Sequence, residues 1–230
     1  MKSNMMLYVG GAALLALSAC GKKAPESSAQ QATPGNQVAQ ATQTPQGAAP
    51  VQVRKYDVKS GIVTFEDVIE AGTMTIKTKR VTFFDDYGMK ECEDRYTGDA
   101  LRESYFSDGQ NLYSVMYSQK MTYLRGPAYR GTMYRFAWDE VSSQDKASGK
   151  AKQIAAMTIA GKTCDAFQVG DPASGDYTTY AGWNHVAFMI DMHGKGTHSV
   201  QKAVKFEENA TVPSEKFQPP AGFAVKNSPI

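Results

Sequence analysis

The sequence predicts a β-rich α+β fold, in which one or two short helices pack on a single curved antiparallel sheet. From Arg54 onward, short runs of β-branched and aromatic residues alternate with polar ones, and Gly, Asp and Asn separate the runs. This pattern is typical of strands joined by tight turns. Helical periodicity occurs in one short segment only. Because strands do not alternate with helices, the pattern of a parallel βαβ sheet is missing.

Each predicted strand is a run with a period of two that ends at a turn residue. In chain order, the predicted strands are residues 56–67, 73–84, 89–96, 103–106, 111–117, 121–124, 156–159, 163–169, 177–190 and 200–206. Tight turns are expected at residues 85–88, 108–109 and 161–162. The long run 177–190 is expected to break at Gly182, because glycine weakens the interior of a strand.

Two segments depart from simple alternation. In the second strand, Met74 and Ile76 share one parity whereas Val81 and Phe83 have the other, which predicts a bulge near residues 79–80.

The spacing of Tyr134, Trp138 and Val141 fits one face of a helix, so we expect a short helix that begins near Met133. The polar residues 142–152 fit either a helix or a loop.

The segment 183–190 is apolar on both faces of the predicted sheet. Val186, Phe188 and Ile190 share one face, and Trp183, Ala187 and Met189 share the other. A sheet with one face in water does not show this pattern. Either helices cover the second face or that face lines an apolar cavity, and the residues leave both readings open.

The amino terminus predicts export and lipid attachment. Residues 5–17 form an apolar run of signal-peptide length, too short to span a bilayer as a helix. Leu17, Ser18, Ala19 and Cys20 follow as a lipobox, with Gly21 after it. This motif resembles that of bacterial lipoproteins. The resemblance implies cleavage after Ala19, so that residues 1–19 are the signal peptide, and attachment of acyl chains to Cys20, which anchor the protein in a membrane.

Residues 20–53 are predicted to be the acylated cysteine followed by a disordered linker, because they are rich in Ala, Gln, Pro and Thr and have no aromatic residue. Residues 54–230 form the predicted single β-rich domain. Without the four charged residues that precede Arg54, the domain has equal numbers of basic and acidic residues. This balance argues against nucleic acid as a partner.

Five stretches carry a further resemblance, and together they span residues 55–226. They are residues 59–65 (KSGIVTF), 83–91 (FFDDYGMKE), 158–164 (TIAGKTC), 180–184 (YAGWN) and 216–223 (KFQPPAGF). In order and spacing they are similar to an uncharacterised family of envelope lipoproteins related to the LolA/LolB-like lipoprotein carriers. The resemblance implies an unclosed half-barrel, with helices plugging its concave side and acyl chains bound there. It transfers no pocket residue to this chain.

The two cysteines of the domain, Cys92 and Cys164, are an even pair in an exported protein, which favours a disulfide between them. Two separate buried thiols are the alternative.

The histidine-containing run Asp191, His193 and His198 has no usual zinc spacing, and the glycines within it indicate an exposed loop. We therefore expect no metal site and no cofactor. No nucleophile elbow, phosphate-binding loop or zinc-protease motif occurs, so no catalytic residue is assigned and a hydrolase is disfavoured.

The candidate ligand contacts are methionine and aromatic residues, which adapt to flexible apolar chains. They are Tyr113, Met116, Tyr117, Met121, Tyr123, Trp138 and Trp183. An ordinary hydrophobic core would use the same residue types.

These observations predict a membrane-anchored, non-enzymatic envelope lipoprotein that binds a lipid or an apolar protein segment. The alternative is a structural or assembly module that contacts other envelope proteins. Because Gly21 is not the aspartate that retains some lipoproteins in the inner membrane, the resemblance implies the outer membrane, facing the periplasm.

Overall fold

The computed structural model describes residues 54–128 and 135–228. The predicted signal peptide, Cys20 and the linker lie outside the described residues, as do Met133 and Tyr134 of the predicted helix. Within the described residues, no helix is long and apolar enough to cross a membrane.

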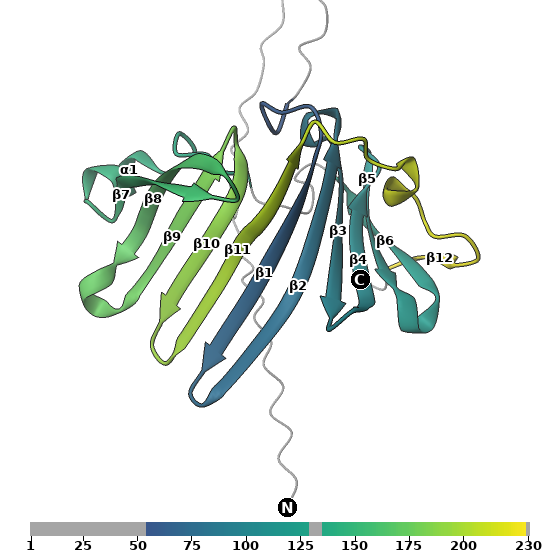
Figure 1. Ribbon diagram of the computed structural model, residues 1–230, viewed down its shortest axis with the longest axis horizontal. Helices are drawn as coiled ribbons and strands as arrows, with labels where there is room; N and C mark the ends of the chain where they lie inside the picture. The colour runs from purple at the N-terminus through teal and green to yellow at the C-terminus, as the bar shows by residue number, and fades with distance from the viewer. Residues whose placement is uncertain (1–53, 129–134, 229–230) are drawn as a thin grey trace, which may run out of the picture. The chain divides into compact units, whose positions relative to one another are not determined.

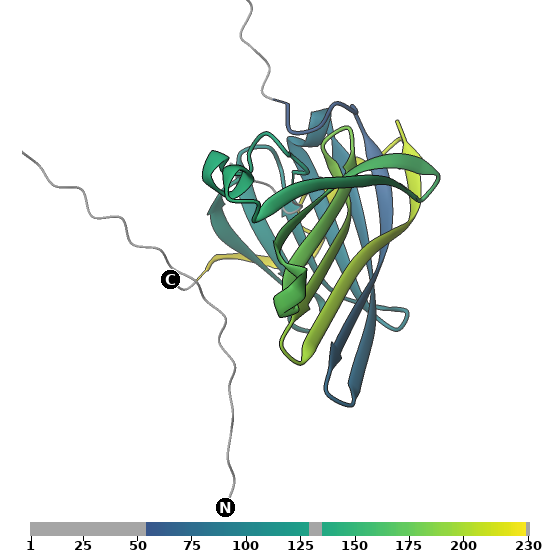
Figure 2. The ribbon, with the colours of Figure 1, turned by 90° about the vertical axis from the view of Figure 1, so that its left-hand side faces the viewer.

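The described residues form one sheet of twelve strands in the order β12-β6-β5-β4-β3-β2-β1-β11-β10-β9-β8-β7 (Figure 1). The strands are β1 (Gly61–Ala71), β2 (Met74–Asp85), β3 (Lys90–Thr97), β4 (Ala100–Ser107), β5 (Asn111–Met116), β6 (Met121–Pro127), β7 (Ala151–Ile159), β8 (Lys162–Asp171), β9 (Asp176–Trp183), β10 (Val186–Gly194), β11 (Thr197–Glu208) and β12 (Ala224–Asn227). All neighbours are antiparallel except β12 and β6. The sheet curves without closing, because β7 and β12 stay at its ends (Figure 2). The predicted unclosed, antiparallel-rich sheet is therefore confirmed.

The helices differ from the prediction. The one α-helix of the described residues is α1 (Ser143–Ala147), and residues 135–142, which include Trp138, are not helical. The helix begins in the polar segment instead, where the Ser142 hydroxyl accepts a hydrogen bond from the Asp145 backbone N–H at 3.0 Å. The apolar spacing around Trp138 therefore reflects packing of an irregular segment. The short 3-10 turns of the described residues are η1 (Asp86–Gly88), η2 (Tyr117–Gln119), η3 (Pro172–Ser174) and η4 (Ser214–Phe217).

The predicted bulge in the second strand is wrong. β2 pairs with β1 in one unbroken register from Met74 to Phe84. Arg80, Thr82 and Phe84 are buried on the same face on which Met74 and Ile76 are exposed nearer the hairpin tip. The apolar residues of this strand change from even to odd positions in the sequence because Arg80 occupies a buried even position at which an apolar residue was expected.

The run 177–190 is two strands, and the break lies after Gly182. Asn184 and His185 form the turn, both with positive φ (49° and 64°). Gly182 stays within β9, where the Phe136 side chain lies against its Cα and leaves no room for a Cβ. The glycine therefore serves close packing rather than the turn.

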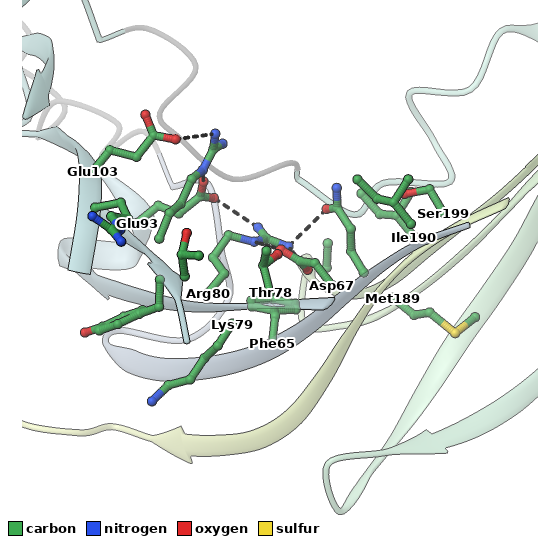
Figure 3. A pocket seen from close by; sticks show the side chains of 17 residues that line it. Phe65, Asp67, Thr78, Lys79, Arg80, Glu93, Glu103, Met189, Ile190 and Ser199 are labelled. Atoms are coloured by element: carbon green, nitrogen blue, oxygen red, sulfur yellow. Dashed lines mark hydrogen bonds and ion pairs between the residues drawn. The ribbon is translucent and has the colours of Figure 1, made fainter. Parts of the chain in front are cut away.

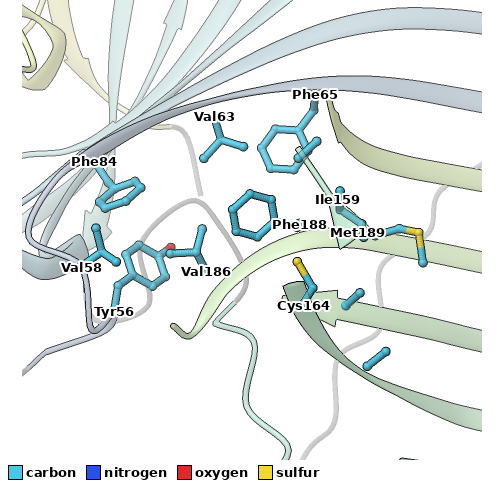
Figure 4. Packing of buried hydrophobic residues seen from close by; sticks show 13 residues of the cluster. Tyr56, Val58, Val63, Phe65, Phe84, Ile159, Cys164, Val186, Phe188 and Met189 are labelled. Carbon is cyan, nitrogen blue, oxygen red and sulfur yellow. The ribbon is translucent and has the colours of Figure 1, made fainter. Parts of the chain in front are cut away.

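The main core lies where the amino-terminal residues of the domain cross the sheet (Figure 4). It contains Tyr56, Val58, Val63, Phe65, Phe84, Ile159, Cys164, Ala166, Ala181, Val186, Phe188, Met189 and Ala203. Tyr56 packs edge-on against Phe84, with ring centroids 5.0 Å apart. This cluster fills one end of the curved sheet and leaves the other end open to the cavity described below.

A second core lies on the opposite face of β2–β5. Phe83, Cys92, Phe106 and Tyr113 are cross-strand neighbours in one row. The segment after β11 covers them with Val212, Phe217 and Phe223. On these strands the second apolar face is thus covered by the chain's own carboxyl-terminal segment, which includes the short 3-10 turn η4.

Candidate functional site

A cavity of about 390 Å³ lies against six neighbouring strands, β4-β3-β2-β1-β11-β10. Because the strands of a curved sheet converge on its inner side, a cavity that touches all six lies on the concave side. Its volume falls within the usual range of ligand pockets, about 300–1,000 Å³. This cavity is the candidate binding site (Figure 3).

One wall of the cavity is apolar. It consists of Phe65 and Ile69 from β1 and Ala187, Met189 and Ile190 from β10. Phe65 and Ile190 are buried, whereas Ile69 is 45% exposed at the open end. Met74, Ile76 and Met192 are also exposed large apolar residues. Ile69 pairs with Ile76 across β1 and β2, so the apolar surface continues from the cavity to the hairpin tip.

Beside this apolar wall the cavity is charged, and Arg80, the cross-strand partner of Phe65, is the centre of the charged part. Arg80 Nε lies 3.0 Å from Asp67 Oδ2, and Arg80 Nη1 lies 3.0 Å from Glu93 Oε2. Arg80 Nη2 also donates to Gln201 Oε1 at 3.0 Å. Burial alone would lower the pKa of Arg80, but its contacts with Asp67 and Glu93 outweigh burial and raise it. The guanidinium therefore stays charged and fixed, with its plane over the Phe65 ring.

Further cations lie toward the rim. Arg95 pairs with Glu93 at 2.6 Å and reaches Glu103 at 3.5 Å, and its side chain is half exposed. Arg102 lines the cavity from β4 and is exposed. The structure records no ion pair or hydrogen bond for the Arg102 side chain among the described residues. The charges deep in the cavity thus neutralise one another, and a cation is available at the rim.

This arrangement suits the binding of a ligand. The carboxylates of Asp67 and Glu93 both accept hydrogen bonds from Arg80, which fixes their positions. A ligand with an apolar body would contact the β1–β10 wall, and its polar end would face the guanidinium groups. Arginine recognises carboxylate and phosphate groups through its fork of donors.

None of the seven predicted ligand contacts lines this cavity. Tyr113 and Tyr117 pack against the second core. Met116 and Met121 are cross-strand partners on β5 and β6, and the Tyr123 hydroxyl donates to Gln119.

The two tryptophans among the predicted ligand contacts lie elsewhere in the structure. Trp183 packs on Phe206 beneath the Lys162 ammonium. Trp138 lines a second cavity of about 360 Å³, together with Phe136, Phe167 and His185. The predicted contacts are therefore dispersed over the sheet rather than brought together.

Sequence reasoning missed Arg80, Glu93 and Arg95. The signal was present in the second strand, where an unbroken period of two places Arg80 on the same face as Thr82 and Phe84. A charged residue at such a position needs a buried partner. The partners lie on other strands, so the local pattern does not identify them.

The predicted disulfide is not formed in the structure. Cys92 and Cys164 are both free and buried. They belong to different hydrophobic clusters, Cys92 to the second core and Cys164 to the main core. The alternative of two separate thiols is the one that the structure shows.

We expect neither thiol to react in the folded protein. Burial and the nearby Asp94 raise the pKa of Cys92, and burial raises the pKa of Cys164 to about 11. Thiols react through the thiolate, so both should be inert at pH 8. In a Cys20→Ser variant, a thiol reagent should label no cysteine under native conditions and two in denaturant without reductant. Labelling of none in denaturant would instead show a disulfide.

The histidine-containing run is not the exposed loop that was expected. Asp191 and His193 lie on β10, His198 lies on β11, and only residues 195–196 form the turn. His193 and His198 are cross-strand partners. The glycines on either side of Lys195 allow a tight turn, which brings the two imidazoles together.

Comparisons with known proteins show the fold. No protein-family model and no curated protein matches the sequence. An uncharacterised conserved protein from Thermus thermophilus is similar over 77% of this chain and 95% of its own, with 6% identity and a TM-score of 0.51.

Two further solved structures are more distant. The Pseudomonas aeruginosa MucA/MucB complex has 11% identity and a TM-score of 0.45, with coverage of 75% of this chain and 59% of that one. The LolA superfamily protein NE2245 from Nitrosomonas europaea has 9% identity and a TM-score of 0.35, with coverage of 73% and 93%. LolA superfamily structures are thus among those similar to this chain, as the sequence resemblance predicted. At these identities, similarity of fold assigns no activity.

Proposed function

We propose that the protein is a non-enzymatic envelope lipoprotein, anchored through acyl chains on Cys20, that binds the apolar chain of an amphipathic ligand in the concave cavity. The single observation that carries this proposal is the cavity of about 390 Å³ with one apolar and one charged wall. The lipobox at Cys20 and the linker up to residue 53 support its placement in the cell envelope.

The size of the cavity limits the ligand. At about 390 Å³ it lies near the small end of ligand pockets, which suits one acyl chain or one apolar peptide side-chain cluster rather than a whole two-chain lipid. The apolar surface that continues to Ile69 and Ile76 lets a longer chain extend toward the hairpin tip. A single-chain anionic amphiphile, such as a fatty acid, fits both walls.

Mass spectrometry tests the proposal on protein purified from its native membrane. We expect a single-chain amphiphile to accompany the protein in native spectra and to be released by denaturation. If no amphiphile accompanies it and no fluorescent fatty acid binds the delipidated protein, the proposed function is wrong.

Arg102, the exposed cation at the rim of the cavity, predicts that binding depends on the charge of the ligand's headgroup. Arg102→Gln should weaken binding of a fatty acid about two- to fivefold, because exposed ion pairs contribute about 0.2–1 kcal/mol. The loss should vanish at high salt and for the corresponding fatty alcohol. Lys90→Gln, which removes an exposed cation outside the cavity lining, is the matched control. Equal effects of the two substitutions would contradict a role for Arg102.

An assembly module is the second candidate, and one observation favours it. β7 is the last strand of the sheet, so one of its edges has no strand partner among the described residues. An extended segment of a partner protein can add to such an edge. Gln153 is an exposed residue of β7, and its neighbour Ile154 packs on the main core. If a partner protein pairs with β7, Gln153→Pro should abolish its capture while fatty acid binding persists.

A further inference from the structure

We propose that Asp191, His193 and His198 form a divalent transition-metal site of the zinc type on the face of the sheet opposite the cavity. One ligand atom from each of the three residues lies within 4.8 Å of the other two. Asp191 Oδ1 lies 3.1 Å from His193 Nε2 and 2.8 Å from His198 Nε2, so both imidazoles point at the same carboxylate oxygen.

The distances suit a metal ion after a small adjustment. Zinc bonds of about 2.0–2.1 Å in a tetrahedral site place neighbouring ligand atoms about 3.3 Å apart. The separations of Asp191 Oδ1 from His193 Nε2 and His198 Nε2 are a few tenths of an ångström shorter than this, so slight side-chain rotations open the space for an ion. Two imidazoles and one carboxylate suit zinc, copper or nickel rather than magnesium or calcium. Three protein ligands leave a fourth position for water or another ligand.

The neighbouring residues hold the two rings in place. Tyr177, His193, His198 and Glu70 form one row across β9, β10, β11 and β1. The Tyr177 ring stacks on His193 at 4.3 Å, and His193 stacks on His198 at 4.2 Å. His198 Nδ1 lies 3.2 Å from Glu70 Oε2. A carboxylate on the far nitrogen of a ligating histidine is the usual device that fixes its tautomer and orientation.

The site is separate from the proposed ligand cavity. Successive residues of a strand face opposite sides of the sheet. Ile69 and its cross-strand partner Ser199 line the cavity, so the next pair, Glu70 and His198, faces the other side. His193 is the partner of His198, and Asp191 lies two residues from His193 on the same strand, so both share that face. The Asp191, His193 and His198 side chains are about one-quarter to one-third exposed, which leaves the site accessible to an ion from solvent. Since a bound ion would join β10 to β11, it should stabilise this hairpin.

The test is Zn²⁺ binding to the full chain with the substitution Cys20→Ser, purified without a polyhistidine tag. Calorimetry should give one Zn²⁺ per chain, and Co²⁺ should give the visible absorption of a tetrahedral site. His198→Ala and Asp191→Asn should each weaken Zn²⁺ binding more than tenfold. Glu70→Gln should weaken it by about tenfold, the lower end of the range for residues that orient a ligand.

His185 provides the matched control, because it is the third histidine of the chain and also pairs with an aspartate, Asp57, at 3.1 Å. His185→Ala should bind Zn²⁺ as the parent protein does. Circular dichroism checks that each variant is folded. Binding of much less than one Zn²⁺ per chain, or unchanged affinity in a folded His193→Ala/His198→Ala variant, would overturn the proposal.

Discussion

Replacement of Lys55 by methionine should lower the free energy of unfolding by about 3–5 kcal/mol, because it removes the cation from a buried carboxylate. Lys55 Nζ lies 2.8 Å from both carboxylate oxygens of Glu91, whose side chain is fully buried. The Tyr56 hydroxyl donates to the same carboxylate. Denaturant unfolding of the Cys20→Ser protein measures the loss.

Two variants serve as controls. Lys59→Met removes an exposed lysine and should change stability by less than about 0.5 kcal/mol. Adding Glu91→Gln to Lys55→Met removes the buried charge while an acceptor for the Tyr56 hydroxyl remains, so it should recover much of the loss. A loss below about 1 kcal/mol for Lys55→Met would show that Glu91 does not depend on this cation.

The Lys55–Glu91 ion pair lies close to the point at which the predicted linker joins the domain. Lys55 and Tyr56 are the second and third residues after the predicted linker, and both backbone N–H groups donate to the Tyr87 carbonyl oxygen. The buried pair therefore fastens the point at which the predicted membrane tether joins the domain.

The second large effect is expected for a substitution that fills the cavity and so weakens fatty acid binding. Thr78→Trp places an indole in a cavity of about 390 Å³ that Thr78 lines from β2. We expect binding of a fluorescent fatty acid to weaken at least tenfold, which corresponds to about 1.4 kcal/mol. Because the indole occupies open space rather than packed core, the melting temperature should change little.

Thr75→Trp is the matched control for this substitution. Thr75 lies three residues earlier on the same strand, is exposed, and faces the other side of the sheet. It should bind the fatty acid as the parent protein does. If both variants bind equally well, the ligand does not occupy the concave cavity.

The strands were predictable because their signal is local. β2, β3 and β8 lie within a few residues of their predicted bounds, since alternation and turn glycines specify each strand by itself. The helix near Trp138 was wrong because apolar spacing alone does not separate a helix from an irregular packed segment.

The candidate site depends on contacts that are distant in the sequence. β1 pairs with β11, so that Asp67 and Gln201 both reach Arg80. The predicted contacts from Tyr113 to Tyr123 are instead close in sequence and lie on β5, on β6 and in the turn η2 between them, outside the strands that line the cavity. Composition identified residues suited to apolar contact, but register decides which of them face the cavity.

Methyl NMR of the protein, labelled at isoleucine and methionine, tests the proposed binding site most directly. When a spin-labelled fatty acid is added, the methyl signals of Ile69 and Ile190 should broaden first, because both residues line the cavity. Those of Met116 and Met121, on β5 and β6, should remain sharp. Broadening at Met116 and Met121 with no effect at Ile69 and Ile190, or no broadening at all, would contradict binding in the concave cavity.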